Sequence, residues 1–204
     1  MFSERVQSRA ARREATRERV LAAAERLFRA QGFGATTVRQ IAAEAGVSAG
    51  TVMSVGDKDA LLVAIFDGWI DAVHRARTGD DGTAPAPMSA DVAVDAIMAL
   101  FEPFIRYFAG DEELSREYAA IIVRGAHESA IFRNLALSLI TEIAEALARA
   151  GLGGVDSGRA ARVVHYAYLG ILMTVSHGTI QEPDAVDQLR EVVGFVVTHE
   201  GGEE

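Results

Sequence analysis

The chain has no cysteine, and Lys58 is the only lysine among its 20 basic residues. Without cysteine, disulfide bonds, thiol catalysis and cysteine-ligated zinc fingers are excluded. Long apolar runs are missing too: residues 163–175 form the longest nearly apolar stretch, which is interrupted by His165 and is shorter than the roughly 20 residues a membrane span needs. The N-terminus is polar and arginine-rich, without the apolar segment of a secretory signal. We therefore expect a cytoplasmic protein with no membrane partner.

Signatures of catalysis are missing from the sequence as well. It contains no Ser-His-Asp signature, no HExxH and no P-loop, and the glycine-rich segment GLGGVDSG (151–158) does not follow a strand as a nucleotide loop should. His165 and His177 are twelve residues apart, or about 120° around a helix, so they do not form an adjacent ligand pair. We predict no enzymatic activity, no cofactor and no metal site.

Period-2 alternation, the pattern of half-buried strands, is also absent, and apolar residues recur instead at three- and four-residue steps. The chain is therefore predicted to be all-α. Residues 1–13 are read as an arginine-studded arm, and residues 78–87 (TGDDGTAPAP) as a linker. Outside the helix-turn-helix described below, helices are expected over residues 16–30, from residue 57 or 58 onwards, and near 89–108, 111–127, 131–150, 157–179 and 184–198.

Residues 36–55, TTVRQIAAEAGVSAGTVMSV, have the pattern of a helix-turn-helix. Gly46 can adopt the positive φ of a tight turn between two short helices. Thr36 or Thr37 can cap the first helix and Ser48 the second. The small or apolar residues fall at inward positions: Val38, Ile41, Ala42, Ala45, Val47, Val52 and Val55. Such a unit usually places its second helix in the major groove of DNA.

Charge is distributed unevenly along the chain. Residues 1–58 hold 10 basic and 6 acidic residues, a net charge of +4, whereas residues 59–204 hold 10 and 23, a net charge of −13; together they give the chain's −9. A basic head on an acidic body suits a module that binds duplex DNA and is carried by a body that does not. We therefore predict two domains, residues 1–58 for DNA binding and residues 59–204 for ligand binding and dimerisation.

The segment 16–62, TRERVLAAAERLFRAQGFGATTVRQIAAEAGVSAGTVMSVGDKDALL, resembles the TetR family of bacterial transcriptional regulators. A helix, "GF-x-x-TTV", "IA-x-x-AGVS", "GT" and "K-x-x-LL" follow one another in the family's order. The resemblance implies an N-terminal three-helix head on a helical C-terminal body. It also implies a homodimer that binds double-stranded, palindromic operator DNA and releases it when a small-molecule effector binds in the body.

One segment departs from the family pattern. The family usually has an aromatic residue two positions after "GT" and then a His-Phe pair, whereas residues 53–58 of this chain read MSVGDK and are one residue shorter. The usual aromatic packs on DNA and the usual histidine touches a phosphate. Both contacts are absent or substituted here.

Candidate DNA contacts fall into four groups. Thr37 can offer its hydroxyl and amide to a phosphate, or serve only as a cap. Arg39 can reach a phosphate or a guanine edge, or lie solvated beside Glu44. The exposed face of the second short helix is small and weakly polar, so direct base reading from it looks poor; its members are Ser48, Ala49, Gly50, Thr51 and Ser54. Lys58 occupies the family's phosphate-binding position, and the arm arginines can enter the minor groove.

The resemblance places the effector pocket among the body helices. Aromatic residues and methionines there favour an apolar or aromatic effector, with histidines as polar anchors, although each residue can equally be ordinary core. The candidates are Phe66, Trp69, Met98, Phe101, Phe104, Tyr107, Tyr118, His127, Phe132, His165 and Tyr168. Pro103 removes one backbone hydrogen bond within its helix, and the resulting bend can open a cavity.

Two apolar stripes near the C-terminus are candidates for the dimer surface. One contains Val164, Ala167, Tyr168, Ile171 and Val175, and the other Val186, Leu189, Val193, Val196 and Val197. Two stripes from each chain would form a four-helix interface, unless they pack within the monomer.

Three functions therefore remain open. The chain is a ligand-responsive DNA-binding repressor, a ligand-binding helical dimer with weakened or lost sequence-specific DNA binding, or, least in keeping with the sequence, a small helical enzyme.

Overall fold

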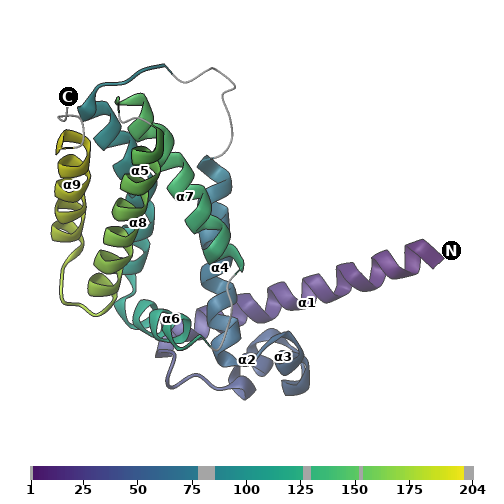
Figure 1. The fold of residues 1–204 in the computed structure, drawn as a ribbon. Helices are drawn as coiled ribbons and strands as arrows, with labels where there is room; N and C mark the ends of the chain where they lie inside the picture. The colour runs from purple at the N-terminus through teal and green to yellow at the C-terminus, as the bar shows by residue number, and fades with distance from the viewer. Residues whose placement is uncertain (1, 78–85, 126–129, 152–153, 200–204) are drawn as a thin grey trace. The chain divides into compact units, whose positions relative to one another are not determined.

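The computed structural model describes residues 2–77, 86–125, 130–151 and 154–199. All regular secondary structure in these ranges is helical (Figure 1), which confirms the all-α prediction. The helices are α1 (Phe2–Gln31), α2 (Val38–Ala45), α3 (Ala49–Val55), α4 (Lys58–Arg77), α5 (Ala90–Gly110), α6 (Glu112–Arg124), α7 (Ala130–Arg149), α8 (Gly154–Ser176) and α9 (Glu182–His199). Among the described residues, no helix combines the length and apolarity needed to cross a membrane.

The chain divides into two compact units. The head unit comprises residues 1–69 and 117–128, and the body unit comprises residues 70–116 and 129–204. Two of the three divisions fall inside helices, namely α4 and α6, so each of these helices has residues in both units. The division at residue 58 that the sequence suggests lies instead at the beginning of α4, and it stays a prediction.

The head unit is built around a small core from α1 to α4. Val20, Ala24 and Phe28 of α1 are buried, as are Ile41 of α2 and Val52 of α3. These residues follow the three- and four-residue spacing read from the sequence, so the predicted inward face of the helix-turn-helix is confirmed at Ile41, Ala42, Ala45 and Val52.

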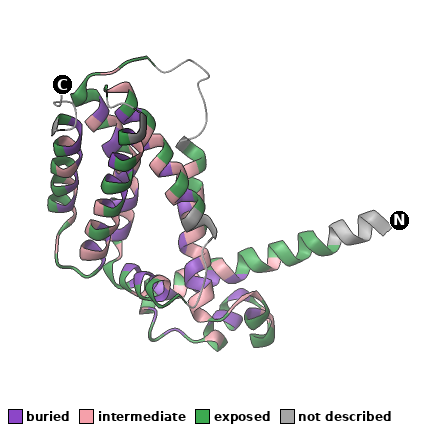
Figure 2. Ribbon diagram, viewed as in Figure 1, coloured by how far each residue is buried: buried purple, intermediate pink, exposed green. Residues whose placement is uncertain are grey.

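Helix α1 begins at Phe2, so the prediction of a non-helical arm over residues 1–13 and a helix start at Thr16 is wrong. An apolar stripe is the pattern that predicts a helix from the sequence, and residues 2–15 have none. They are nevertheless rich in arginine, alanine and glutamate, which favour helix by themselves. Residues 9–19 are exposed apart from the partly covered Thr16, as the mainly green stretch of α1 between its grey N-terminal end and the head core shows (Figure 2).

The body unit is formed mainly by α5, α7, α8 and α9, which run side by side (Figure 1). Helix α8 packs on α7 and α9, and α5 packs on α7, α8 and α9. Buried aliphatic and aromatic side chains from all four helices fill the interior, among them Ile97, Phe101, Ile143, Val164 and Leu189. This bundle supplies the core that the apolar spacing of the last two thirds of the chain predicts.

Two connections in the body unit differ from, or lie outside, the expectations. Helix α8 begins at Gly154, so the expected start of this helix near residue 157 is wrong by three residues. The predicted linker lies outside the described residues at positions 78–85. Its end is tied to the C-terminus of α7, where Met88 N–H donates to Arg149 O (3.0 Å) and Arg149 Nε donates to Ala86 O (2.9 Å).

Candidate functional sites

The turn between α2 and α3 has the geometry that the sequence predicts. Gly46 adopts φ 65° and ψ 38°, and its amide donates to the last carbonyls of α2. Thr37, rather than Thr36, caps α2: its hydroxyl accepts from Gln40 N–H, and Gln40 Oε1 accepts from Thr37 N–H at 2.9 Å. The reciprocal bonds form a capping box. Thr36 is buried and donates its hydroxyl to Gly32 O (2.8 Å), which fixes the preceding loop.

Helix α3 presents few free polar groups. Ser48 caps it by accepting from Thr51 N–H (3.0 Å), the Ser48 and Thr51 hydroxyls lie 2.9 Å apart, and the Ser54 hydroxyl donates to Thr51 O (2.7 Å). Local bonds thus occupy the three hydroxyls that were candidates for reading bases. Ser48, Ala49, Gly50 and Ser54 are exposed as expected, whereas Thr51 is partly covered.

Met53 was not among the sequence candidates, yet its side chain is 53% exposed on α3. An exposed apolar side chain on a helix that enters the major groove can contact thymine methyl groups. The signal was present in the sequence, since Met53 follows the buried Val52 and therefore lies on another face of the helix.

Arg39 and Lys58, the two predicted cationic contacts, have different surroundings. Arg39 is exposed, and among the described residues it has no ion pair; Glu44, its suggested partner, is bound by Arg26 Nη2 at 3.0 Å instead. Lys58 is partly buried at the first position of α4. Its Nζ donates to Phe33 O (2.9 Å) and lies 4.2 Å from the centroid of the Phe33 ring. Arg39 is thus free to reach a phosphate, whereas Lys58 would have to give up its contacts with Phe33.

The short connection between α3 and α4 depends on Gly56. A Cβ at this position would lie 2.8 Å from Ala60 Cβ, which is closer than two carbons can approach. Gly56 therefore lies directly against the first turn of α4. A side chain at position 56 would require the start of α4 to shift.

The body unit encloses a small apolar cavity of about 20 Å³. That is room for about one water molecule. Residues of α4, α5, α7 and α8 line it: Ile70, Phe104, Phe108, Leu135, Ala136, Leu139, His165, Tyr168, Leu169 and Leu172. A larger ligand can enter only if the four helices move apart.

His165 is the main polar group at the cavity. Its side chain is almost fully buried, and its Nδ1 has no hydrogen-bond partner among the described residues. Burial lowers the pKa of His165 below 6.5, so the ring is neutral near pH 7. Tyr168 lies nearby, with ring centroids 6.1 Å apart, and burial raises the pKa of its hydroxyl. The cavity therefore offers one neutral hydrogen-bonding ring in an apolar lining.

The other ligand candidates lie elsewhere. Phe66 and Tyr118 stack on each other in the head unit, with centroids 4.3 Å apart. Met98 and Phe101 are buried in the body core, and Trp69 and Tyr107 are partly buried; none of these six lines the cavity. His127 and the side chain of Phe132 lie outside the part that the structure describes. Only Phe104, His165 and Tyr168 are brought together, with aliphatic neighbours that the sequence does not distinguish from ordinary core.

The two apolar stripes suggested for the dimer pack within the monomer. Val164, Tyr168 and Val175 of α8 and Leu189 and Val193 of α9 are buried in the body unit, so this part of the dimer prediction is wrong in its residues. The solvent-facing sides of α8 and α9 carry other large apolar residues: Val163 (56% exposed) and Tyr166 (64%) on α8, and Phe195 (62%) on α9.

A capped helix-turn-helix in one unit and a small apolar cavity in the other define the class of helical DNA-binding regulators. Comparison with known proteins shows what the chain is similar to. Residues 20–65 match the family model described as bacterial regulatory proteins, tetR family. Over these residues, which carry the helix-turn-helix, the chain is similar to the TetR family of transcriptional regulators.

Individual relatives and solved structures agree with this similarity. An HTH-type transcriptional regulator of Mycobacterium tuberculosis is 25% identical over 191 residues, which cover 93% of this chain and 84% of the relative. Among solved structures, the TetR-family repressor FadR of Thermus thermophilus, in complex with lauroyl-CoA, has a similar fold; it is 24% identical with a TM-score of 0.59 and coverage of 92% and 95%. The SmeT–triclosan complex is 26% identical, with a TM-score of 0.52 and coverage of 91% of both chains.

Proposed function

We propose that the chain is a ligand-responsive repressor that leaves a palindromic operator when a small apolar or aromatic effector binds in the body unit. The observation that carries this proposal is the complete turn geometry of the head unit: Gly46 in the left-handed region, with Thr37 and Ser48 as caps on either side. Such a unit exists to present its second helix to the major groove. A cytoplasmic location follows from this proposed role.

On the DNA side, the described residues support a division of roles. Arg39 is the best candidate for a charged contact because it is exposed and unpaired within the described chain. Thr37, Ser48 and Thr51 hold the backbone in position through their local hydrogen bonds. Each hydroxyl contacts a phosphate with the hydrogen-bonding positions that these local bonds leave open. Ala49, Gly50, Met53 and Ser54 form the groove-facing surface, which favours close approach and methyl contacts over hydrogen-bonded base reading. Lys58 contributes if it exchanges the Phe33 carbonyl for a phosphate.

On the effector side, the lining of the cavity sets the chemistry. The ligand is largely apolar and presents one hydrogen-bonding group to neutral His165, whose Nδ1 lacks a partner among the described residues. A permanently charged ligand is disfavoured there, because an ion in an apolar cavity loses its hydration. The similar SmeT structure is a complex with triclosan, a small aromatic compound, which supports this class of ligand.

Coupling between effector and DNA is proposed to run through α4. Ile70 of this helix lines the cavity, and Lys58, at its first position, contacts Phe33. Within the head unit, α4 also carries Asp59, which pairs with Arg124 of α6 (3.5 Å). Expansion of the cavity would move Ile70 and, because a helix transmits displacement along its axis, the start of α4. The effector and the operator would then weaken each other's binding reciprocally.

The proposal requires a homodimer, because two heads about 34–36 Å apart are needed to enter successive major grooves. The outer faces of α8 and α9 support it, since they expose Val163, Tyr166 and Phe195. Large apolar side chains left on the surface of two neighbouring helices are typical of an interface.

The test is selection of bound duplexes from a random library at physiological salt, followed by sequencing. The proposal expects an enriched palindrome whose half-sites lie one helical turn apart. Weak, salt-sensitive binding with no enriched sequence would support the second candidate instead, a ligand-binding dimer without specific DNA recognition. That alternative is favoured by one observation, the local bonds that occupy the hydroxyls of α3.

A further inference from the structure

Helix α3, with the sequence AGTVMSV, carries no charged side chain. Attraction between cationic side chains and phosphates supplies most of the sequence-independent affinity of proteins for duplex DNA. A head that inserts this helix into a major groove must therefore draw its cations from elements beside it. The described residues closest to α3 that could do so lie on α1.

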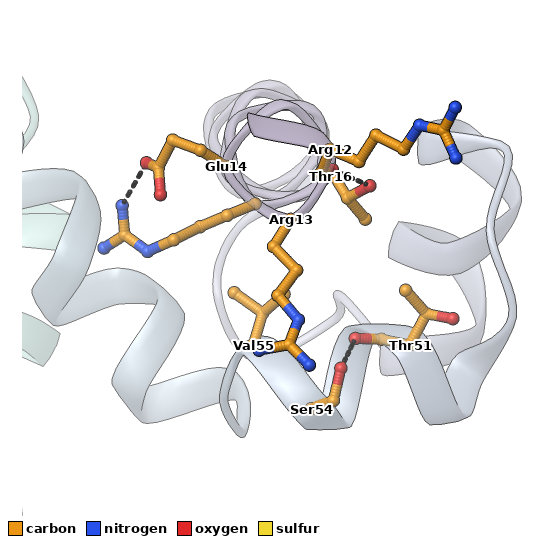
Figure 3. A pocket seen from close by; sticks show the side chains of 8 residues that line it. Arg12, Arg13, Glu14, Thr16, Thr51, Ser54 and Val55 are labelled. Carbon is orange, nitrogen blue, oxygen red and sulfur yellow. Dashed lines mark hydrogen bonds and ion pairs between the residues drawn. The ribbon is translucent and has the colours of Figure 1, made fainter. Parts of the chain in front are cut away.

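A groove of about 620 Å³ in the head unit lies between α1 and α3 (Figure 3). One wall is the first half of α1, with Arg12, Arg13 and Arg17; the other is α3, with Thr51, Ser54 and Val55. Figure 3 shows the Arg13 side chain directed toward Ser54 and Val55, while Arg12 extends to the other side of α1. Side chains of α1 thus border the same space as the uncharged helix.

The charge in this groove is only partly compensated. Arg17 pairs with Glu14 at 3.5 Å. Arg12 and Arg13 are both exposed, and within the described part of the chain neither has a carboxylate partner. Both guanidinium groups are therefore uncompensated: Arg13 is directed into the groove toward α3, and Arg12 lines its outer edge.

The exposed half of α1 has no packing role that would explain it. Between residues 9 and 19 no side chain is buried, and the first core residue of the helix is Val20. The backbone that carries the two arginines is part of α1 and is helical up to the core. Within this stretch the Thr16 hydroxyl donates to Arg12 O (2.8 Å). Helical geometry fixes the directions in which Arg12 and Arg13 leave the helix, which a flexible arm would not.

We propose that this groove holds one phosphate strand of the duplex, with Arg12 and Arg13 as its phosphate-binding residues. When α3 occupies the major groove, the strands that border that groove pass along its two sides. The side formed by α1 then supplies the charge that α3 lacks. This inference rests on the proposed DNA-binding function and adds a binding surface outside the helix-turn-helix.

The test compares variants on one duplex, the sequence enriched by the wild-type protein. Arg12→Gln and Arg13→Gln should each lower the slope of log K against log salt by about 1 and weaken binding about fivefold near 0.15 M salt. The double variant should lower the slope by about 2. Arg13→Lys should keep the wild-type slope, because it keeps the charge.

Arg19→Gln is the matched control, since Arg19 is an exposed arginine of the same helix that does not line the groove. Circular dichroism of every variant checks that α1 stays helical. A double variant that binds the duplex with the wild-type affinity and slope would overturn this inference and leave the proposed function intact. A wild-type protein that binds no duplex at all would overturn both.

Discussion

The head and body units are both built from helices, but their structures depend on different features. In the head, function depends on a few local features: a left-handed glycine, two caps and short helices around a small core. In the body, long helices with continuous apolar stripes enclose a cavity of only about 20 Å³. The head therefore depends on local backbone geometry, whereas the body depends on how four helices pack around a small space. The proposed function needs this difference, because a unit that reports ligand binding must have two packings.

The largest expected effect on stability comes from truncating one buried isoleucine in each core. Ile41 in the head and Ile143 in the body are both fully buried. Replacing either by alanine should lower the free energy of unfolding by about 2–5 kcal/mol. Ile41→Ala should also abolish duplex binding while an apolar ligand still binds, and Ile143→Ala should do the reverse. Thermal unfolding and the two binding assays measure this; equal loss of both activities in both variants would mean that the units are not functionally separate.

The next largest effect is expected at the connection between α3 and α4. Gly56→Ala brings a Cβ within 2.8 Å of Ala60 Cβ, and overpacking of this kind costs about 1–3 kcal/mol. Gly50→Ala is the control, since its nearest neighbour, Ser48 Oγ, would lie at an ordinary 3.7 Å and alanine favours helix. Urea denaturation should show the first variant destabilised and the second unchanged or more stable. A neutral Gly56→Ala would mean that the close helix approach is not required.

A smaller effect is expected from Lys58→Met at the start of α4, which separates a role of Lys58 in folding from a role in DNA binding. The variant keeps the aliphatic stem but loses the hydrogen bond to Phe33 O and the contact with its ring, which should cost about 1–2 kcal/mol. If Lys58 also meets a phosphate, the salt slope for the duplex falls by about 1. Chemical unfolding and a salt titration separate the two roles: lost stability with an unchanged slope would assign Lys58 to the fold alone.

The smallest effect is the pH dependence contributed by His165. Burial lowers its pKa in the folded protein below 6.5, so the unfolded chain binds more protons between these two values. The stability that the neutral ring contributes is therefore complete above pH 6.5 and is lost as the pH falls through the folded pKa. His165→Gln should flatten the dependence of the unfolding free energy on pH below 6.5. If wild type and variant follow the same pH curve, His165 is not desolvated in the fold.

Sequence reasoning succeeded where the determinants are local. Gly46 and Ser48 could be assigned, and the first cap narrowed to Thr36 or Thr37, because turn glycines and caps act on backbone within three or four residues. It failed at the N-terminal half of α1, where helix forms without any apolar stripe. The beginning of α8 at Gly154 differs from the expected residue 157 for the opposite reason, because glycines predict a break although the first turn of a helix tolerates them.

The cavity and the interface could not be assigned from the sequence, because they depend on how helices pack. Phe101 and Phe104 have the same chemistry and are nearly one turn apart, yet only Phe104 lines the cavity. The two stripes that contain Val164 and Leu189 are candidates for a dimer surface from the sequence, but an apolar stripe has the same spacing whether its partner is in the same chain or another. The exposed Tyr166 and Phe195 became distinguishable only when burial was known.

The proposed coupling is that occupation of the body cavity releases the head from DNA. The most direct measurement is a fluorescence-anisotropy titration of the enriched palindrome, with and without a compound whose binding is abolished by filling the cavity with Ala136→Phe. The compound is expected to weaken duplex binding about 5- to 150-fold in the wild-type protein and to leave it unchanged in Ala136→Phe. Equal duplex affinity of the wild-type protein with and without the bound compound would contradict it.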